Sequence, residues 1–493
     1  MYNYNRLAEK IKKKSKIFID KVSGGLNKTE YRFLFQMFYG LLGSGSVLLS
    51  EISRSLEESI TLKKTIERLS RNLKTFDKIE EVQSNYIKEV SKVINDETVF
   101  CIDHTDIAKP KSKELESMGR VRDGSTGKIE NGYKIFEIAA LTKENKMPIS
   151  VYSRVFSPEE DNYISENRET LDGFRYLSEK FGNIGIRTLD RGFDNKKLYE
   201  YFIDANEKFI IRAKKNRDVI HRGKSQNILD VTKKYKGKYT LTFKSKNEDA
   251  KKVKISYIPI ELPAFPGINL TLVTVYGFGK IPMMLITNIT SDEKKIARTV
   301  LKVYLLRWRI EEYFKFKKQQ FDFENIRVRK LKAIRNLNQI LTLVIGFISI
   351  LSEEQDKSFF VLSVIEKANA IFDKNKNKIT FTYYRIAQGI QNTLAKTTTG
   401  IKYLLPKVKY VKNQQLSMFK RSNIEKYTPL ASWFWGNLKF WYKKMSIKKW
   451  AFFKLIFKLK YLEFPYYSFD HYSFFPFASE LNTFQLFDSF LIP

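Results

Sequence analysis

Cysteine and histidine are scarce in this chain of 493 residues. The one cysteine is Cys101, and the three histidines are His104, His221 and His471. A single cysteine excludes an intrachain disulfide framework, and so few Cys and His residues argue against a zinc site. If the protein uses a metal ion, carboxylates must hold it, which favours a hard cation such as Mg²⁺ or Mn²⁺.

Long hydrophobic runs are also missing. The N-terminal stretch MYNYNRLAEKIKKKSKIF lacks the apolar core of a secretory signal peptide. The longest clean apolar run extends from about Ile340 to Leu351, which is too short to cross a bilayer. We therefore expect a buried helix at this run, and a cytoplasmic protein with access to DNA and no membrane partner.

Acidic residues are few relative to basic ones. The chain holds 88 Lys and Arg against 54 Asp and Glu, which gives a net charge of +34. Such an excess indicates a polyanionic partner, with nucleic acid as the first candidate. The imbalance is greatest between Lys402 and Lys460, where 15 Lys and Arg face a single acid, Glu425.

The first 95 residues have a helical pattern and are expected to form a DNA-binding domain. Residues 46–73 divide into two short amphipathic helices, which is typical of a helix-turn-helix motif. Lys63, Lys64 and Arg68 on the second helix are the candidate DNA contacts. An ordinary helical hairpin fits the same pattern, so both interpretations stay open.

The pattern changes to strands from residue 97 onward. Strands are predicted at 97–103, 132–141, 147–156, 184–193 and 208–215, with helices at 169–182 and 195–205. Strands and helices in this order predict an α/β domain with a mixed sheet covered by helices. The short strands that follow indicate an all-β insertion over residues 216–283.

The rest of the chain is predicted to be largely helical. A long helix is expected from about 291 to 320, and a helical C-terminal region over 351–430. The tail of residues 431–493 is basic and rich in aromatic residues. Such a tail fits either nucleic-acid binding or a poorly ordered extension.

Four residues of the segment YLLRWRIEEYFKFKKQQ, 304–320, share one face of an ideal helix. With 100° per residue and Tyr304 at 0°, the other three fall near −60°, −20° and −40°. These three are Arg307, Glu311 and Lys318. An acid flanked by cations and a phenol could bind a metal ion and DNA phosphates, whereas the plain alternative is a set of surface ion pairs.

Two aspartates accompany this helix. Asp103 and Asp190 each follow an apolar run that is predicted to be a strand. Three converging carboxylates can hold two Mg²⁺ ions ~4 Å apart. Asp106 and Asp194 are the rival positions. We prefer Asp103 because it continues its strand directly, and Asp190 because Asp194 follows a glycine and is suited to capping the next helix.

These residues together resemble a known family. The spacing of Tyr304, Arg307, Glu311 and Lys318 matches the Y-x2-R-x3-E-x6-K motif of bacterial insertion-sequence DDE transposases. DHT at 103–105 and DRGF at 190–193 are similar to the first and second motifs of that family, and FIIRAKKNR at 209–217 is similar to the strand that often follows. The resemblance covers roughly residues 90–350.

The resemblance implies an RNase H-like catalytic domain, formed by 96–215 and 284–350 around the β-rich insertion. It implies that Asp103, Asp190 and Glu311 hold two Mg²⁺ ions, for which Mn²⁺ would substitute. It also implies DNA cleavage at the ends of the element, attack of the freed 3′-OH on target DNA, and a homodimer that joins two ends.

DNA contacts are expected from residues around the same helix, namely Tyr304, Arg307, Lys318, Trp308 and Arg212. Two other functions remain alternatives at this point. One is a domesticated nuclease that does not carry out strand transfer. The other is a non-catalytic DNA-binding protein, in which the helical N-terminus and the basic tail would do all the binding.

Overall fold

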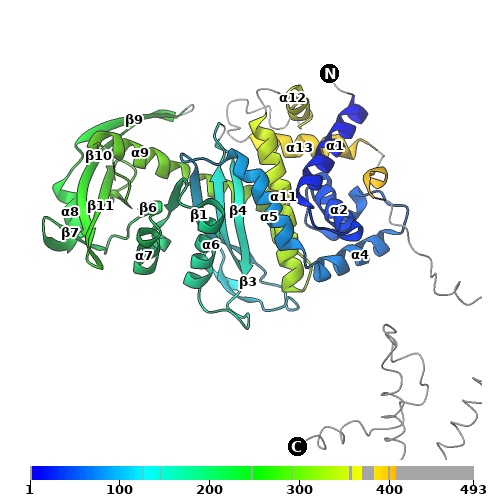
Figure 1. The fold of residues 1–493 in the computed structure, drawn as a ribbon, viewed down its shortest axis with the longest axis horizontal. Coiled ribbons are helices and arrows are strands. Elements are labelled where there is room, and N and C mark those ends of the chain that lie inside the picture. The colour runs from blue at the N-terminus through cyan, green and yellow to red at the C-terminus, as the bar shows by residue number, and fades with distance from the viewer. Residues whose placement is uncertain are drawn as a thin grey trace, which may run out of the picture. The chain divides into compact units, whose positions relative to one another are not determined.

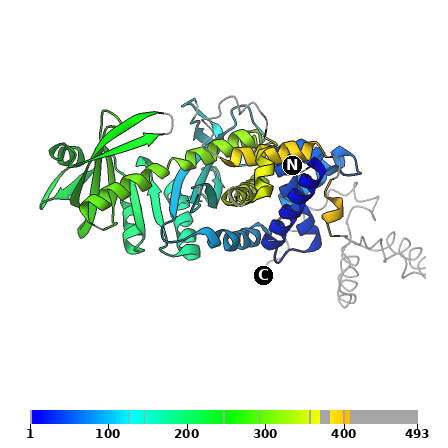
Figure 2. The same cartoon turned by 90° about the horizontal axis from the view of Figure 1, so that it is seen from above.

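The computed structural model describes residues 3–406, apart from positions 125, 145, 246–247, 291, 355–357, 369–381 and 398–399. Met1–Val408 form one compact unit, which Figure 1 shows as a ribbon and Figure 2 shows from above. The predicted tail and positions 407–430 of the predicted C-terminal helical region lie outside the described residues.

The N-terminal region is helical, as the sequence predicted. Its helices are α1 (Tyr4–Val22), α2 (Lys28–Ser44), α3 (Leu49–Ser55), α4 (Leu62–Thr75) and α5 (Ile79–Val90). A capping box begins α2, because the Asn27 side chain accepts from the backbone of Glu30 while the Glu30 carboxylate accepts from the backbone of Asn27. Helices α3 and α4 are the two short helices expected within residues 46–73.

Strands of the described residues join into one mixed sheet. Its order is β2-β3-β1-β5-β6-β12-β11-β10-β7-β8, with β4 paired to β3 and β9 paired to β10. The strands are β1 (Val99–Ala108), β2 (Gly119–Arg122), β3 (Ile129–Leu141), β4 (Pro148–Phe156), β5 (Ile186–Leu189), β6 (Lys208–Arg212), β7 (Asp218–His221), β8 (Lys224–Asn227), β9 (Tyr239–Ser245), β10 (Glu248–Leu262), β11 (Phe265–Tyr276) and β12 (Met283–Thr287). Strands β1, β5 and β6 are parallel and their outer neighbours are antiparallel, which confirms the predicted mixed sheet flanked by helices.

Helices cover both faces of the sheet. The side chains of β1 show which face packs against α6 and which packs against α9. Side chains alternate along a strand, so Phe100 and Cys101 point in opposite directions. The Phe100 ring packs 5.9 Å from that of Phe181 in α6 (Glu166–Phe181). The Cys101 thiol donates to the Leu306 carbonyl, at 3.5 Å, at the end of α9 (Glu293–Leu306). Asp103 therefore shares the face that α9 covers.

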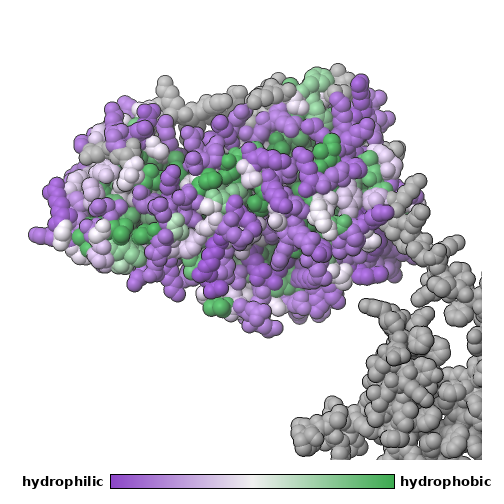
Figure 3. Space-filling model, in the orientation of Figure 1, coloured by the Kyte–Doolittle hydropathy of each residue, from purple (hydrophilic) through white to green (hydrophobic). Residues whose placement is uncertain are grey.

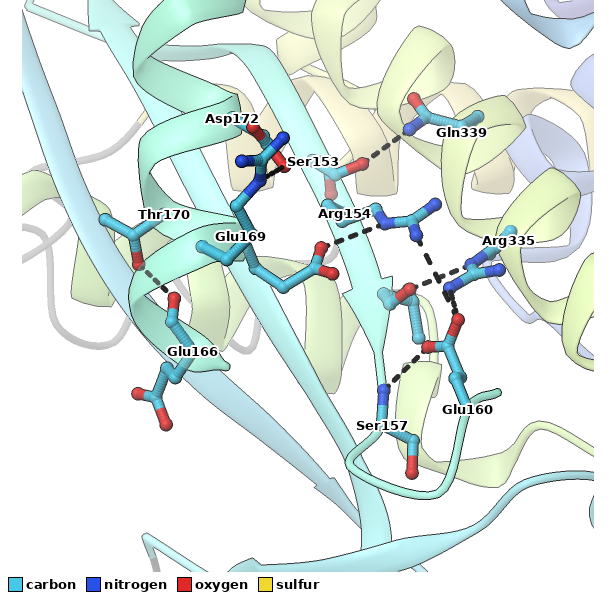
Figure 4. Close-up of polar contacts among 12 residues, drawn as sticks. Ser153, Arg154, Ser157, Glu160, Glu166, Glu169, Thr170, Asp172, Arg335 and Gln339 are labelled. Atoms are coloured by element: carbon cyan, nitrogen blue, oxygen red, sulfur yellow. Dashed lines mark hydrogen bonds and ion pairs between the residues drawn. The ribbon is translucent and has the colours of Figure 1, made fainter. Parts of the chain in front are cut away.

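The outer edge of β4 is covered by α11 (Leu331–Glu353). Gln339 donates to the carbonyl of Ser153, and Arg335 donates to that of Val155 at 2.9 Å. Figure 4 shows the contact between Gln339 and Ser153 beside the ion pair between Arg335 and Glu160. Side chains that satisfy an exposed strand edge protect it from pairing with another chain.

Helix α11 also joins the sheet to the N-terminal helices, because it packs against α2, α4 and α5 as well as β4. It is the one helix of the described residues that is long and apolar enough to cross a membrane, but 83% of its apolar window is buried inside the protein. The prediction of a buried helix at this apolar run is thus confirmed. The face drawn in Figure 3 is mainly hydrophilic.

Several details differ from the expectations. β1 continues to Ala108, so Asp103 lies within the strand and not at its end. The expected long helix is broken into α9, α10 (Arg309–Lys315) and a π-helical turn, η3 (Phe316–Gln320). The insertion is not all-β, because it contains α8 (Ile228–Lys234). Its strands β10 and β11 extend the central sheet through β12. Beyond α11 the described helices are α12 (Phe359–Ile365) and α13 (Thr382–Ala395).

Candidate active site

Strand register brings the two predicted aspartates together. In the parallel pair of β1 and β5, Cys101 lies beside Thr188. Two residues further along are Asp103, within β1, and Asp190, the residue that directly follows β5. Side chains two positions apart point to the same face, and adjacent strands lie ~4.8 Å apart. The two carboxylates therefore stand next to each other on the face that α9 and α10 cover.

A single arginine joins Asp103 to the third predicted acid. Arg307 lies at the break between α9 and α10. Its Nη1 donates to Oδ2 of Asp103 at 2.9 Å, and its Nη2 donates to Oε1 of Glu311 at 2.9 Å. The i,i+4 spacing within the helical segment places Glu311 within reach of the guanidinium. Two of the three predicted acids thus share one cation.

A cavity of about 380 Å³ opens beside these acids. Its lining contains six of the residues that the sequence singled out: Asp190, Arg212, Tyr304, Arg307, Trp308 and Glu311. Trp308 is 53% exposed, while Tyr304 is only 5% exposed and packs in an apolar cluster. The cavity has a cationic and aromatic wall next to an acidic one.

Burial and neighbouring charge perturb the site. Burial raises the pKa of Asp103 to about 6, although Arg307 acts in the opposite direction. Asp190 and Glu311 add to the increase, because each is a nearby negative charge. Burial likewise raises the pKa of Tyr304. Asp103 is thus close enough to both other predicted acids to be affected by their charge.

The rival aspartates have other partners. Asp194 is 1% exposed and accepts from Arg217 at 2.6 Å and from the backbone of Lys214 at 2.7 Å. Asp194 does not cap α7 (Lys196–Asp204) as expected, because Asn195 occupies that position. Asp106 faces Lys318 at 3.9 Å.

A family model describes this part of the chain. The model for the transposase DDE domain matches residues 94–347, which is more than half of the chain. The chain belongs to this family. No curated protein matches the chain.

Among solved structures, the chain is similar to a piggyBac transposase in a synaptic complex with hairpin DNA. The identity is 12%, the TM-score is 0.42, and the alignment covers 86% of this chain and 85% of that one.

Two predicted DNA contacts, one in the DDE domain and one in the N-terminal region, have partners that the sequence did not indicate. Lys318 forms an ion pair with Glu324 at 2.9 Å and does not line the cavity. Arg68 in the N-terminal region pairs with Glu58 at 2.6 Å, whereas Lys63 and Lys64 are exposed on α4. The DNA-binding roles of these residues remain predictions.

Sequence reasoning missed a buried ion pair in the DDE domain, between Lys317 and Glu137. The two side chains are 1% and 0% exposed, and Nζ lies 3.1 Å from Oε2. Glu137 is directly opposite Asp103 in the register of β1 and β3. A single acid in the apolar run KIFEIAAL was the available signal for Glu137, because a buried carboxylate needs a partner. For Lys317 the available signal was its place seven residues after Ile310, on the same apolar face of a helix.

The donor chemistry of the site fits a divalent cation, since carboxylate oxygens are the ligands that Mg²⁺ prefers. Within the described residues, however, no group of three or more His, Cys, Asp or Glu side chains is arranged to hold a metal ion. Two of the predicted ligands are instead bonded to a guanidinium, because Arg307 donates to both Asp103 and Glu311. Ligation by all three acids therefore requires this side chain to move.

Proposed function

We propose that this member of the transposase DDE family cleaves DNA at the ends of a bacterial insertion sequence and joins the 3′-OH ends to target DNA. The observation that supports it most directly is the convergence of Asp103, Asp190 and Glu311 beside a cavity with cationic and aromatic walls. Acids alone could bind a cation without any substrate, whereas the adjoining arginines supply partners for DNA phosphates.

Asp103, Asp190 and Glu311 would hold two Mg²⁺ ions, with Mn²⁺ as a substitute. When bound, such a pair of ions activates the attacking oxygen and stabilises the leaving oxygen. The side chains themselves must be ionised to act as ligands, and they must be free of other cations. Both conditions concern Asp103 most, since its pKa is raised and its carboxylate is bonded to Arg307.

Arg307 has two roles in this proposal. Without DNA, its guanidinium neutralises Asp103 and Glu311. With DNA, it turns to a phosphate, because the planar fork of an arginine matches phosphate oxygens as well as it matches carboxylates. The exchange frees the two acids when substrate is present. Arg212 on the cavity wall contacts the same backbone, and the exposed ring of Trp308 offers a base a stacking surface.

The proposal includes a homodimer that holds two transposon ends, in a cytoplasmic setting near the nucleoid. A nuclease without strand transfer is the main rival, because it would need the same acids. A non-catalytic DNA-binding protein is the other. The basic surface would then suffice, and the convergence of three acids would have no role.

Variants of the three acids test the proposal. Asp103→Asn, Asp190→Asn and Glu311→Gln should each abolish Mg²⁺-dependent nicking of DNA that carries the terminal repeats flanking the gene. Binding of the same DNA in a gel-shift assay should persist. Near-wild-type nicking by any of the three variants would remove that residue from the triad. Nicking without joined products in a strand-transfer assay would favour the nuclease.

A further inference from the structure

The buried pair of Lys317 and Glu137 lies at the centre of a polar cluster inside the core. Oε2 of Glu137 also accepts from the Ser153 hydroxyl at 2.8 Å, and its other oxygen accepts from Ser150. Asn338 of α11 donates to the same Ser153 hydroxyl at 2.9 Å. The cluster thus connects β3, β4, α11 and the π-helical turn that follows α10.

The register of the sheet relates this cluster to the candidate active site. Asp103 on β1 is opposite Glu137 on β3, and Glu137 is opposite Ser153 on β4. Directly opposite residues of antiparallel strands point to the same face, with Cβ atoms ~5 Å apart. Asp103 and Glu137 are therefore adjacent carboxylates in one row across the sheet. Each is bonded to a cation of the segment that lies above them.

The segment that carries Glu311 is attached at both ends of α10. Before Glu311, Arg307 bonds to Asp103, and after it, Lys317 bonds to Glu137. The two attachments differ in their surroundings, since the Arg307 side chain is 14% exposed and that of Lys317 is 1% exposed. Arg307 is accessible from the cavity, whereas Lys317 is enclosed by the core.

The buried stripe of α10 explains why Lys317 faces the sheet. On an ideal helix, Lys317 lies ~120° away from Glu311 and on the same face as Ile310, seven residues earlier, which is buried in the core. Lys317 therefore meets Glu137 inside the core, whereas the next residue, Lys318, pairs with Glu324.

We propose that Lys317 and Glu137 form a positioning pair, which fixes the rotation and depth of α10 above the sheet so that Glu311 meets Asp103 and Asp190. This inference rests on the proposed function. Lys317 and Glu137 remain bonded while Arg307 leaves Asp103 and Glu311 and binds a DNA phosphate. A buried ion pair adds little net stability over apolar side chains of similar size, and its best-attested use is to specify one arrangement over others.

Three variants separate positioning from stability. Lys317→Met and Glu137→Gln each leave one buried group without its partner, so both should melt at lower temperature than the wild type. The double variant has no buried charge left, and its melting temperature should recover toward the wild-type value. A temperature at which all variants are folded is chosen for the assays.

In the double variant, single-turnover nicking of terminal-repeat DNA should stay up to ~100-fold below the wild-type rate, because a misplacement of about 1 Å has that effect on catalysis. Mn²⁺ binding to the protein–DNA complex, followed by electron paramagnetic resonance, should weaken ~10-fold or more, as for other groups that orient ligands. Affinity for the DNA should stay within about twofold, because neither residue is accessible from the cavity.

Lys12→Met is the matched control, since Lys12 is a buried lysine of α1 that pairs with Glu9. It should lower the melting temperature without changing Mn²⁺ affinity. Recovery of melting temperature, nicking rate and Mn²⁺ affinity together in the double variant would overturn the positioning role. Nicking that survives all three substitutions, Asp103→Asn, Asp190→Asn and Glu311→Gln, would instead refute the proposed function, so the two failures are distinguishable.

Discussion

Replacing Asp103 by asparagine should stabilise the metal-free protein above neutral pH. Burial raises the pKa of this carboxyl from 3.8 to about 6, so the folded state favours the protonated form. For a group with a raised pKa, the contribution to stability is fully present below the unfolded value and is lost as the pH rises through the folded value. Asparagine carries no charge at any pH and avoids that loss.

The size of the effect follows from the same shift. A rise of about two pH units corresponds to ~3 kcal/mol at 1.36 kcal/mol per unit. The side chain is 21% exposed, so solvent screening makes this figure an upper bound. In a protein of this size, a change of ~3 kcal/mol moves the melting temperature by up to ~5 °C. Arg307 keeps Glu311 as a partner in the variant.

Thermal melts of both proteins in the presence of a chelator, from pH 4.5 to 8.5, measure the difference. The two melting temperatures should be closest below pH 5, diverge through pH 6 and differ by a constant amount above pH 7. Taking the difference cancels the titration of all other groups. A variant that is less stable at pH 8, or a gap that does not change with pH, would refute the argument that Asp103 is a strained, desolvated acid.

Four further outcomes follow from the contacts. Arg307→Ala should lower the salt slope of DNA binding by ~1, and an unchanged slope would show that Arg307 does not contact a DNA phosphate. The same variant should strengthen Mn²⁺ binding to the DNA-free protein, measured by electron paramagnetic resonance. Lys318→Ala should likewise weaken binding of the terminal DNA in gel shifts and lower the slope. Gly173→Ala should cost ~1–3 kcal/mol in urea melts, because a Cβ there would lie 2.4 Å from the Phe136 ring; an unchanged midpoint contradicts this. Glu160→Gln should cost ~1–3 kcal/mol by removing the charge that Arg335 faces, and should leave nicking unchanged at temperatures where the variant is folded.

Much of the candidate site could be predicted from the sequence, because the apolar runs indicate where strands lie and which residues stand at corresponding positions of neighbouring strands. Asp103 and Asp190 each follow an apolar run, which predicted that the two acids lie next to each other. The parallel pairing of β1 with β5 places them side by side. The expectation that Asp103 ends its strand was wrong. β1 continues to Ala108 because the extended β3 offers it pairing partners as far as Gly132.

The positions of the basic residues were harder to predict. An ideal wheel places Lys318 on the strip of Arg307 and Glu311, and it leaves Lys317 outside that strip. The wheel assumes one unbroken α-helix, whereas the segment is interrupted at Arg307 and again at the π-helical turn. The same wheel places Lys317 on the buried apolar face of α10, where the carboxylate of Glu137 is its partner. The sequence around Lys317 does not indicate that β3, the distant strand that carries Glu137, packs against it.

Arg307 and Lys317, the two cations on either side of Glu311, have opposite roles in the proposed mechanism. One keeps the Glu311 carboxylate in position, and the other releases it. The proposed catalysis needs Glu311 to be held to within a fraction of an ångström, but it also needs the oxygens of Glu311 to be released when DNA binds. One attachment cannot do both. Lys317 is enclosed and bonds to Glu137, which the reaction does not use, so it can hold α10 permanently. Arg307 bonds to Asp103 and Glu311 and faces the cavity, so in the proposed mechanism it is the residue that DNA displaces. This division between a holding residue and a releasing residue would account for a charged pair inside a core where apolar side chains would fold as well.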